Sequence, residues 1–274
     1  MRGGGSPPRP RTLGLETMTD TAPTIDLNFP LTGKIALVTG AASGIGSAIS
    51  DALTAKGATV AVLDINAEIA ESKAKALGNG AKSFVCDVSQ PTSVTQAVAD
   101  VVAAFGGIDI AVNSAGVVFL APAEDLSLDS WDKTINVNLK GSFLVTQAVG
   151  RTMIAAGNGG KIINLASQAG TVAIEEHVAY CASKFGVIGM SKTFAAEWGK
   201  HGICVNTISP TVVLTELGKK AWAGEKGEAA KKRIPTGRFA YPEEIAAAAV
   251  FLASAGANMI NGADLLIDGG YTIL

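Results

Sequence analysis

The sequence is poor in the residues that build disulfide frameworks and metal sites. Its 274 residues include three cysteines, Cys86, Cys181 and Cys204, and two histidines. An odd number of cysteines without C-x-x-C spacing argues against a disulfide framework and is typical of a reducing, cytoplasmic compartment. Because cysteine and histidine do not cluster, we expect no structural or catalytic zinc ion.

The sequence also lacks long hydrophobic runs and an excess of one charge. No stretch of about 18 uncharged apolar residues occurs, so we predict no membrane-spanning helix. The net charge is −2, from 22 basic and 24 acidic residues, and gives no electrostatic support for binding nucleic acid. Residues 1–30 are rich in Gly, Pro, Arg and Thr and lack the apolar segment of a secretory signal. We predict that they form a disordered extension, or that part of them is a leader before a second start at Met18.

Glycine and aliphatic residues are abundant. The chain has 32 glycines and is 48% hydrophobic, so it can form a large core with many tight turns. From Lys34 onward, short aliphatic runs alternate with helical patterns, which predicts one α/β domain over residues 31–274, with a doubly wound parallel sheet of about seven strands flanked by helices. The predicted strands are 35–39, 59–63, 82–86, 108–112, 161–165, 203–209 and 263–267, and the predicted helices include 45–56, 67–77, 94–105 and 242–253. Ligands bind such sheets at the carboxyl ends of the strands, so residues that follow a strand are the candidates for a site.

The first predicted strand runs into a glycine-rich turn, Gly40-Ala41-Ala42-Ser43-Gly44-Ile45-Gly46, and then into a helix. Glycines allow a sharp turn and close approach of a pyrophosphate, to which the helix N-terminus offers free N–H groups. The G-x-x-x-G-x-G spacing alone also fits an ordinary strand-to-helix turn. Asp64 ends the second strand about 20 residues further on, where a carboxylate accepts the ribose hydroxyls of a dinucleotide. Because Asp64 would repel a 2′-phosphate and no cation lies next to it in the sequence, we predict NAD rather than NADP.

A tyrosine and a lysine lie one helical turn apart at Tyr180 and Lys184. A nearby ammonium lowers the pKa of a phenol, which is otherwise near 10. Tyr180 can then exchange a proton with a substrate hydroxyl or carbonyl while a hydride moves to or from nicotinamide. The spacing also occurs at the start of ordinary amphipathic helices. Ser167, which follows a predicted strand, is placed to bind the same substrate oxygen and favours the catalytic interpretation.

Taken together and in this order, the motifs resemble the short-chain dehydrogenase/reductase family in its NAD(P)-binding Rossmann form. The matching motifs are TGAASGIG (39–46), Asp87-Val88, Asn113-Ser114-Ala115-Gly116, Asn138, Ser167, Tyr180 with Lys184, and Pro210 to Thr215. The sequence departs from the usual family pattern at three positions, which carry Ser114, Ala166 and Thr211. Glycine is usual at the last of these, so Thr211 would be strained if the loop required a positive φ.

The resemblance implies a role for each matched residue. Asn138 would hold a water that relays protons to Lys184, and Lys184 would also bind the nicotinamide ribose. Asn113 would steady the central strand and approach the cofactor ribose, although either asparagine alone could equally satisfy local backbone groups. The remaining cofactor roles implied by the resemblance are adenine contacts from Asp87 and Val88, and carboxamide contacts from the backbone of Val213 and the hydroxyl of Thr215. The family also implies a homotetramer.

The segment 209–218, with Trp222 and 233–240, resembles the dicarbonyl/L-xylulose reductases and related sugar-alcohol dehydrogenases. This resemblance implies that Gln168, His177 and Trp222 line the substrate pocket, although each fits an ordinary turn, loop or helix-packing role as well. Those reductases prefer NADPH, whereas Asp64 favours NAD. We therefore predict NAD-linked oxidation of a small sugar alcohol, a tetritol or a pentitol, to the ketose. The charged segment 214–234 is predicted to be a solvated helix and, as a hypothesis, a lid over the substrate.

Two other functions are compatible with the motifs. The first is a 3-oxoacyl-thioester reductase of the same fold, against which Asp64 and the low net charge argue. The second is a catalytically idle NAD(H)-binding regulator, although such proteins typically lose the tyrosine or the lysine. A zinc alcohol dehydrogenase is excluded because the sequence lacks its ligand set.

Overall fold

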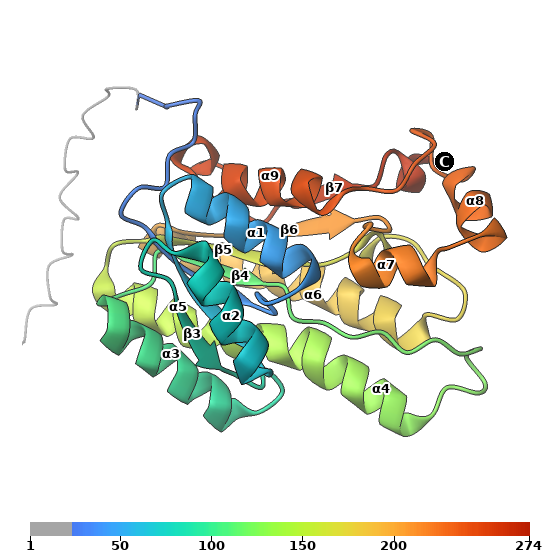
Figure 1. The fold of residues 1–274 in the computed structure, drawn as a ribbon, viewed down its shortest axis with the longest axis horizontal. Helices are drawn as coiled ribbons and strands as arrows, with labels where there is room; N and C mark the ends of the chain where they lie inside the picture. Colours follow the sequence, from blue (N-terminus) through green and yellow to red (C-terminus); the bar gives the residue numbers. More distant parts are fainter. Residues whose placement is uncertain (1–23) are drawn as a thin grey trace, which may run out of the picture.

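Seven parallel strands form the centre of the computed structural model, which describes residues 24–274 (Figure 1). Their order across the sheet is β3-β2-β1-β4-β5-β6-β7, and every neighbouring pair is parallel. The strands are β1 Ile35–Thr39, β2 Thr59–Asp64, β3 Lys82–Val85, β4 Ile110–Asn113, β5 Gly160–Leu165, β6 Ile203–Pro210 and β7 Asp264–Ile267. The doubly wound Rossmann sheet predicted from the sequence is confirmed. The predicted N-terminal extension falls mainly on residues 1–23, outside the described range.

Most of the strands are rich in aliphatic residues because helices cover both faces of the sheet. All residues of β4 and β6 are buried, which explains why their sequences do not alternate between apolar and polar side chains. One face packs against α1, α2 and α9, and the other against α3, α5 and α6 (Figure 1). The helices are α1 Gly44–Ala55, α2 Ala67–Leu77, α3 Pro91–Phe105, α4 Leu128–Thr134, α5 Ser142–Ala156, α6 Val178–Trp198, α7 Glu216–Ala221, α8 Glu225–Lys231 and α9 Pro242–Ala253.

The ends of several elements differ from the predicted ends by a few residues. The third predicted helix starts at Pro91 rather than at residue 94, because a proline is well accommodated in the first helical turn. The fourth strand starts at Ile110 rather than at residue 108, because Asp109 instead binds the start of β1: its N–H donates to the Ile35 carbonyl and its carboxylate accepts from the Ile35 N–H.

The order of the strands changes direction between β1 and β4, which lie next to each other in the sheet. Strands β2 and β3 extend the sheet on one side of β1, and β4 to β7 extend it on the other. The turns that follow β1 and β4 therefore leave the sheet toward opposite faces and leave a crevice at their carboxyl ends. A ligand site is expected at this edge.

Candidate active site

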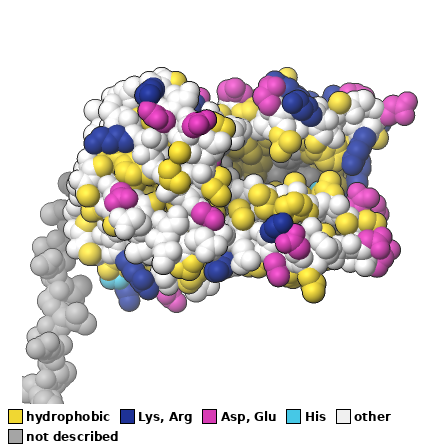
Figure 2. All heavy atoms as spheres, turned by 60° about the horizontal axis from the view of Figure 1, so that its bottom comes forward, with side chains coloured by type: hydrophobic (Ala, Val, Ile, Leu, Met, Phe, Trp, Pro, Cys, Tyr) yellow, Lys and Arg dark blue, Asp and Glu magenta, His cyan; other side chains and the backbone are white. Residues whose placement is uncertain are grey.

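A cavity of about 1540 Å³ lies at the carboxyl edge of the sheet. It is lined by the glycine turn after β1, the segments that follow β4, β5 and β6, the start of α6, and the α7–α8 region. Figure 2 shows it as a deep hollow with hydrophobic walls and charged side chains around its rim. Single small-molecule sites usually measure about 300–1,000 Å³, so the cavity has room for a dinucleotide together with a small substrate.

The glycine turn has the close backbone packing that a phosphate-binding turn needs. Gly40 and Gly44 have positive φ values of +61° and +53°. A Cβ on Gly46 would overlap the carbonyl oxygen of Gly40, so only glycine fits there. Helix α1 starts at Gly44 with no acidic residue in its first turn, and the Ser43 side chain does not cap it. Its N–H groups and the positive end of its dipole are thus available to a pyrophosphate.

Two carboxylates are fixed on the adenosine side of this turn. Asp64, at the end of β2, accepts from the N–H groups of Ala42, at 3.3 Å, and Asn66, at 3.1 Å. Asp87 accepts from the N–H of Ser89 at 2.9 Å and from its hydroxyl at 2.7 Å. Val88 is buried beside Gly141. The glycine turn, the open helix end and these carboxylates fit a nicotinamide dinucleotide.

Asn113 lies in the core rather than in the cavity. It is 3% exposed, and its Nδ2 donates to Thr146 Oγ1 at 3.0 Å and to Asn164 Oδ1 at 2.7 Å. Asn164 in turn donates to Ser191 Oγ at 2.8 Å. This network ties β4 and β5 to α5 and α6, so Asn113 steadies the central strand as expected. The expected approach of its side chain to the cofactor is not seen, because the cavity wall begins with the next residue, Ser114.

Asn138 holds the cavity wall from behind. It lies in a π-helix, Ile135–Gly141, between α4 and α5, and such helices are frequent at functional sites. Its Oδ1 accepts from the N–H of Val117 at 2.8 Å and its Nδ2 donates to the Val117 carbonyl at 2.9 Å. Its own carbonyl accepts from the Ser142 hydroxyl at 2.7 Å. The side chain therefore fixes the segment after β4, and the water relay to Lys184 stays a prediction.

Tyr180, Lys184 and Ser167 all line the cavity. The first two lie one turn apart near the start of α6, and the Nζ of Lys184 is 5.4 Å from the centre of the Tyr180 ring. That Nζ donates to the carbonyl of Leu165, at the end of β5, at 2.7 Å. Ser167 follows β5, and its Oγ accepts from the N–H of Ala169 at 3.1 Å. Its hydroxyl proton is left for another acceptor.

The electrostatics of this trio differ from the expectation. Burial raises the pKa of Tyr180, and hydrogen bonding with Ser167 offsets part of that effect. Burial lowers the pKa of Lys184 to about 8. The net shift of the phenol pKa is therefore upward, opposite to the expected direction, because desolvation dominates and the hydrogen bond of Nζ goes to Leu165. At neutral pH the phenol is protonated and Lys184 carries most of its charge.

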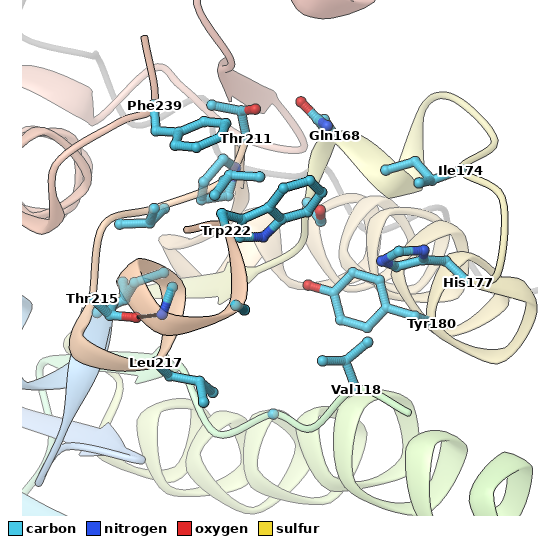
Figure 3. A pocket seen from close by; sticks show the side chains of 18 of the residues that line it. Val118, Gln168, Ile174, His177, Tyr180, Thr211, Thr215, Leu217, Trp222 and Phe239 are labelled. Atoms are coloured by element: carbon cyan, nitrogen blue, oxygen red, sulfur yellow. Dashed lines mark hydrogen bonds between the residues drawn. The ribbon is translucent and has the colours of Figure 1, made fainter. Parts of the chain in front are cut away.

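The three residues predicted to contact the substrate line the same cavity as Tyr180, whose hydroxyl points toward Trp222 (Figure 3). His177 packs edge-on against Tyr180, with ring centres 6.0 Å apart. Its Nδ1 lies 2.6 Å from the carbonyl oxygen of Glu175, which can only accept, so Nδ1 carries the proton and Nε2 is free to accept. Trp222 packs edge-on against Phe239 at 5.8 Å and forms one wall of the cavity, opposite Gln168.

The segment after β6 closes another side of the cavity. Val213 pairs with Ala240, and Thr215 caps α7 by accepting from the N–H of Gly218 at 3.0 Å (Figure 3). The Thr215 hydroxyl can still donate its proton to a carboxamide. Thr211 lies in the cavity wall without a positive φ, so its departure from glycine causes no backbone strain. The predicted helix in 214–234 is two short helices, α7 and α8, separated by Trp222 and Gly224.

Sequence reasoning missed several apolar residues of the cavity wall. They are Val118, Phe119, Ile174, Leu217 and Phe239. Val118, Phe119 and Ile174 lie in the segments that follow β4 and β5, outside any motif. Leu217 and Phe239 lie in the segments 209–218 and 233–240, whose resemblance to sugar-alcohol dehydrogenases could have indicated them.

Two kinds of site are not found in the described part of the chain. Within residues 24–274 no group of three or more His, Cys, Asp or Glu side chains is placed to hold a metal ion. No helix in the same range is long and apolar enough to cross a membrane.

Known proteins resemble this chain over nearly its whole length. A family model described as Enoyl-(Acyl carrier protein) reductase matches residues 40–272. D-threitol dehydrogenase of Mycolicibacterium smegmatis is 67% identical over 253 residues, covering 91% of this chain and 96% of that protein. NAD-dependent glycerol dehydrogenase of Listeria innocua is 52% identical over 90% of this chain and 97% of that protein. The structure of a gluconate 5-dehydrogenase from Burkholderia cenocepacia in complex with NADP and tartrate superposes with a TM-score of 0.86 at 37% identity, covering 90% of this chain and 98% of that chain.

Proposed function

The chain belongs to the short-chain dehydrogenase/reductase family, in its polyol dehydrogenase subgroup, and from this premise we propose that it oxidises a tetritol or pentitol to the ketose with NAD. Because the chain is 67% identical to D-threitol dehydrogenase, a four-carbon polyol is the first substrate to test. In this proposal residues 31–274 form the catalytic domain. Leu31 is 2% exposed and its N–H donates to the Lys56 carbonyl at 2.7 Å, which supports its place in the domain, and Phe29 just before it packs against Phe251 with ring centres 5.5 Å apart.

In the proposed chemistry, Tyr180 accepts the proton of the substrate hydroxyl. The substrate hydroxyl binds between Tyr180 and Ser167, and the phenolate form of Tyr180 takes the hydroxyl proton. The charge of Lys184 stabilises that phenolate, and Asn138 holds the wall that keeps the substrate oxygen in place. When bound, the nicotinamide accepts the hydride from the carbinol carbon. Ser167 donates a hydrogen bond to the substrate oxygen as it becomes a carbonyl.

The proposed cofactor is NAD because of the surroundings of Asp64. Its carboxylate is held by two backbone N–H groups at the end of β2. The next residues are Ile65, which is 68% exposed, and Asn66, and neither supplies a cation for a 2′-phosphate. In the same proposal the helix end at Gly44 binds the pyrophosphate. The remaining contacts are adenine with Asp87 and Val88, ribose with Lys184, and carboxamide with Val213 and Thr215, while Asn113 acts only by steadying β4.

An uncharged, hydroxyl-rich substrate fits the wall around Tyr180. His177 offers an acceptor in Nε2 and Gln168 offers an amide, while Trp222 covers the carbon chain. The charged side chains that line the cavity are balanced in sign. They are Glu175, Glu176 and Glu216 against Lys184, Lys226 and Arg233.

Similarity to the 3-oxoacyl-(acyl-carrier-protein) reductase of Thermotoga maritima, 41% identical over 89% of this chain, favours a second candidate, reduction of a 3-oxoacyl thioester. This candidate reaction is a reduction rather than an oxidation, and its substrate is an acyl thioester rather than a polyol. A thioester reductase would act on acetoacetyl-coenzyme A with NADPH, whereas a polyol dehydrogenase would not.

The experiment is an NAD-reduction screen over tetritols, pentitols, hexitols and glycerol. It is repeated with NADP, with the Tyr180→Phe variant, and in reverse with acetoacetyl-coenzyme A and NADH or NADPH. We expect the highest kcat/KM for a tetritol or pentitol with NAD, and loss of this activity in the variant. Turnover of the thioester without turnover of any polyol would overturn the proposal.

We also propose that the enzyme is a cytoplasmic homotetramer. Large apolar side chains are exposed on α5 and α6, where Phe143 is 37% and Phe185 49% exposed, and at the C-terminus, where Ile273 is 80% exposed. Such surfaces support burial against other copies. The three cysteines are unpaired, as expected in a reducing compartment. Light scattering coupled to size exclusion should give the mass of four chains.

A further inference from the structure

Two polar side chains in the wall of the catalytic cavity are buried without satisfying their hydrogen-bonding atoms. Gln168 is 6% exposed and Thr211 is 8% exposed, and both line the cavity. The Oε1 of Gln168 and the Oγ1 of Thr211 have no hydrogen-bond partner among residues 24–274. An unpaired buried polar atom is costly, so a pair of them in one wall calls for an explanation.

The sheet places these two residues next to each other. Strands β5 and β6 are parallel neighbours, and Leu165 pairs with Ile208 at their carboxyl ends. Gln168 and Thr211 each follow that pair by three residues. Figure 3 shows the two side chains on the same side of the cavity, above Trp222, with their oxygen atoms turned toward each other and the amide nitrogen of Gln168 turned toward the cavity.

The chemistry of the two groups is complementary. A threonine hydroxyl can donate one proton, and an amide oxygen can only accept. The two atoms are not hydrogen-bonded to each other in the structure, but a side-chain rotation that brings Thr211 Oγ1 to Gln168 Oε1 would satisfy both atoms at once. It would also fix the direction of the amide, so that both N–H donors of Gln168 face the cavity. His177 offers an acceptor, Nε2, from the other side of Tyr180.

We propose that Thr211 is a positioning residue that holds the Gln168 amide with its N–H groups toward the substrate. This inference rests on the proposed polyol oxidation and deepens it. A polyol hydroxyl away from the reacting carbon accepts from Gln168, and another donates to His177. The enzyme thereby selects a chain with several hydroxyls over an alcohol that lacks them, and the hydroxyl of Thr211 sets that selectivity without touching the substrate.

The test uses Thr211→Val, which keeps the shape and removes the hydroxyl, and Thr211→Ser, which keeps the hydroxyl. The substrates are threitol and butane-2,3-diol, which has the same carbon chain without the terminal hydroxyls. We expect Thr211→Val to lower the ratio of kcat/KM for threitol to that for the diol about tenfold, mainly through KM. Thr211→Ser should restore the ratio. An unchanged ratio in Thr211→Val would overturn the proposal.

A second measurement needs no substrate. If Thr211 bonds to Gln168, Thr211→Val should raise the unfolding equilibrium constant about fivefold, and the change should fall below about twofold in a Gln168→Leu background. A truly unpartnered hydroxyl predicts the opposite, because valine would then stabilise the protein. Equal effects in both backgrounds, or stabilisation by valine, would refute the contact. If the wild-type enzyme oxidises no polyol, the proposed function fails, and the unfolding cycle still decides the contact.

Discussion

The ammonium of Lys184 lies 5.4 Å from the centre of the Tyr180 ring, and its hydrogen bond goes to the main-chain carbonyl of Leu165. The buried ammonium therefore donates to a neutral carbonyl in a desolvated site. This desolvation lowers the pKa of Lys184 to about 8. Lysine at this position is kept at a cost to the stability of the fold, because the protein must hold a charge where an apolar side chain would fit better.

Replacing Lys184 with methionine should not destabilise the protein at pH 7. A shift of the lysine pKa from 10.5 to about 8 corresponds to about 3 kcal/mol, and an unpaired Leu165 carbonyl costs about 1–3 kcal/mol. We expect the variant to be between equally stable and about 2 kcal/mol more stable in urea unfolding, and to be inactive. Lower stability than wild type at pH 7 would contradict this balance.

The lowered pKa of Lys184 also predicts how the stability difference between Lys184→Met and wild type varies with pH. Between pH 8 and 10.5 the unfolded chain binds a proton that the native Lys184 has released, so wild-type stability rises with pH in this window. Below pH 8 the full cost of the buried charge is present. The advantage of Lys184→Met should thus shrink from pH 8 to 10.5. Lys192→Met, at an exposed position of α6, serves as the control and should show no such trend.

The rate of alcohol oxidation should rise with pH. Burial raises the pKa of Tyr180, and only the deprotonated phenol accepts the substrate proton. We expect kcat/KM for the polyol to increase roughly tenfold per pH unit up to about pH 8 and to level off above it, where Lys184 loses the charge that stabilises the phenolate. Ketose reduction uses the protonated phenol and should lack this rise. Tyr180→Phe should lose about 10²–10⁴-fold in activity, whereas Tyr241→Phe, at a half-exposed tyrosine away from the cavity, should remain active.

Cofactor choice should depend on the carboxylate of Asp64. Asp64→Ser removes the charge that repels a 2′-phosphate and the acceptor for the ribose hydroxyls. Hydrogen bonds to a charged group contribute about 1.5–3 kcal/mol, so kcat/KM with NAD should fall about 10- to 100-fold while use of NADP rises. Asp51→Asn, at an exposed carboxylate paired with Lys73, is the control. If the ratio of NAD to NADP use in Asp64→Ser equals that of wild type, the assigned role is wrong.

Adding one methyl group at Gly46 should abolish dinucleotide binding. The new Cβ would overlap the carbonyl oxygen of Gly40 and force the turn apart. NADH fluorescence titration should show no saturable binding, and thermal unfolding should show a lower Tm. Gly189→Ala provides the matched control, because its Cβ would meet no atom within 4 Å on an exposed part of α6. That change should leave binding intact and add up to about 1 kcal/mol of stability. Normal NADH affinity in Gly46→Ala would contradict the packing argument.

The sequence was sufficient to predict the elements and the residues that follow them. Aliphatic runs buried on both faces and glycines before a helix are local signals, so the seven strands and the turn at Gly40–Gly46 could be placed from them. Asp64 was predictable for the same reason, because it ends a strand.

Directions of side chains were harder to predict. Asn113 follows the same rule as Asp64 but turns into the core, where Thr146 and Asn164 take its hydrogen bonds. Asn138 supports Val117 instead of facing the cavity. The desolvation of Tyr180 and Lys184 depends on how α6 packs against β5. The spacing of four residues between them carries no information about that packing. The contact that we propose between Gln168 and Thr211 could not be inferred without the register between β5 and β6, which lie about 40 residues apart in the chain.

The functional residues of the proposed site fall into two groups along the chain, one before the end of β4 and one after β5. In the proposed function, the turns up to Asn113 bind the pyrophosphate and the adenosine, whereas the groups near the reacting carbon, together with Lys184, Val213 and Thr215, come after β5 and β6. Substitutions among the substrate-facing residues of the later part can therefore reshape the chamber while the earlier part stays intact. A gene encoding this fold can acquire new alcohol substrates in this way, provided that the proton-transfer residues and the cofactor contacts of the later part are kept.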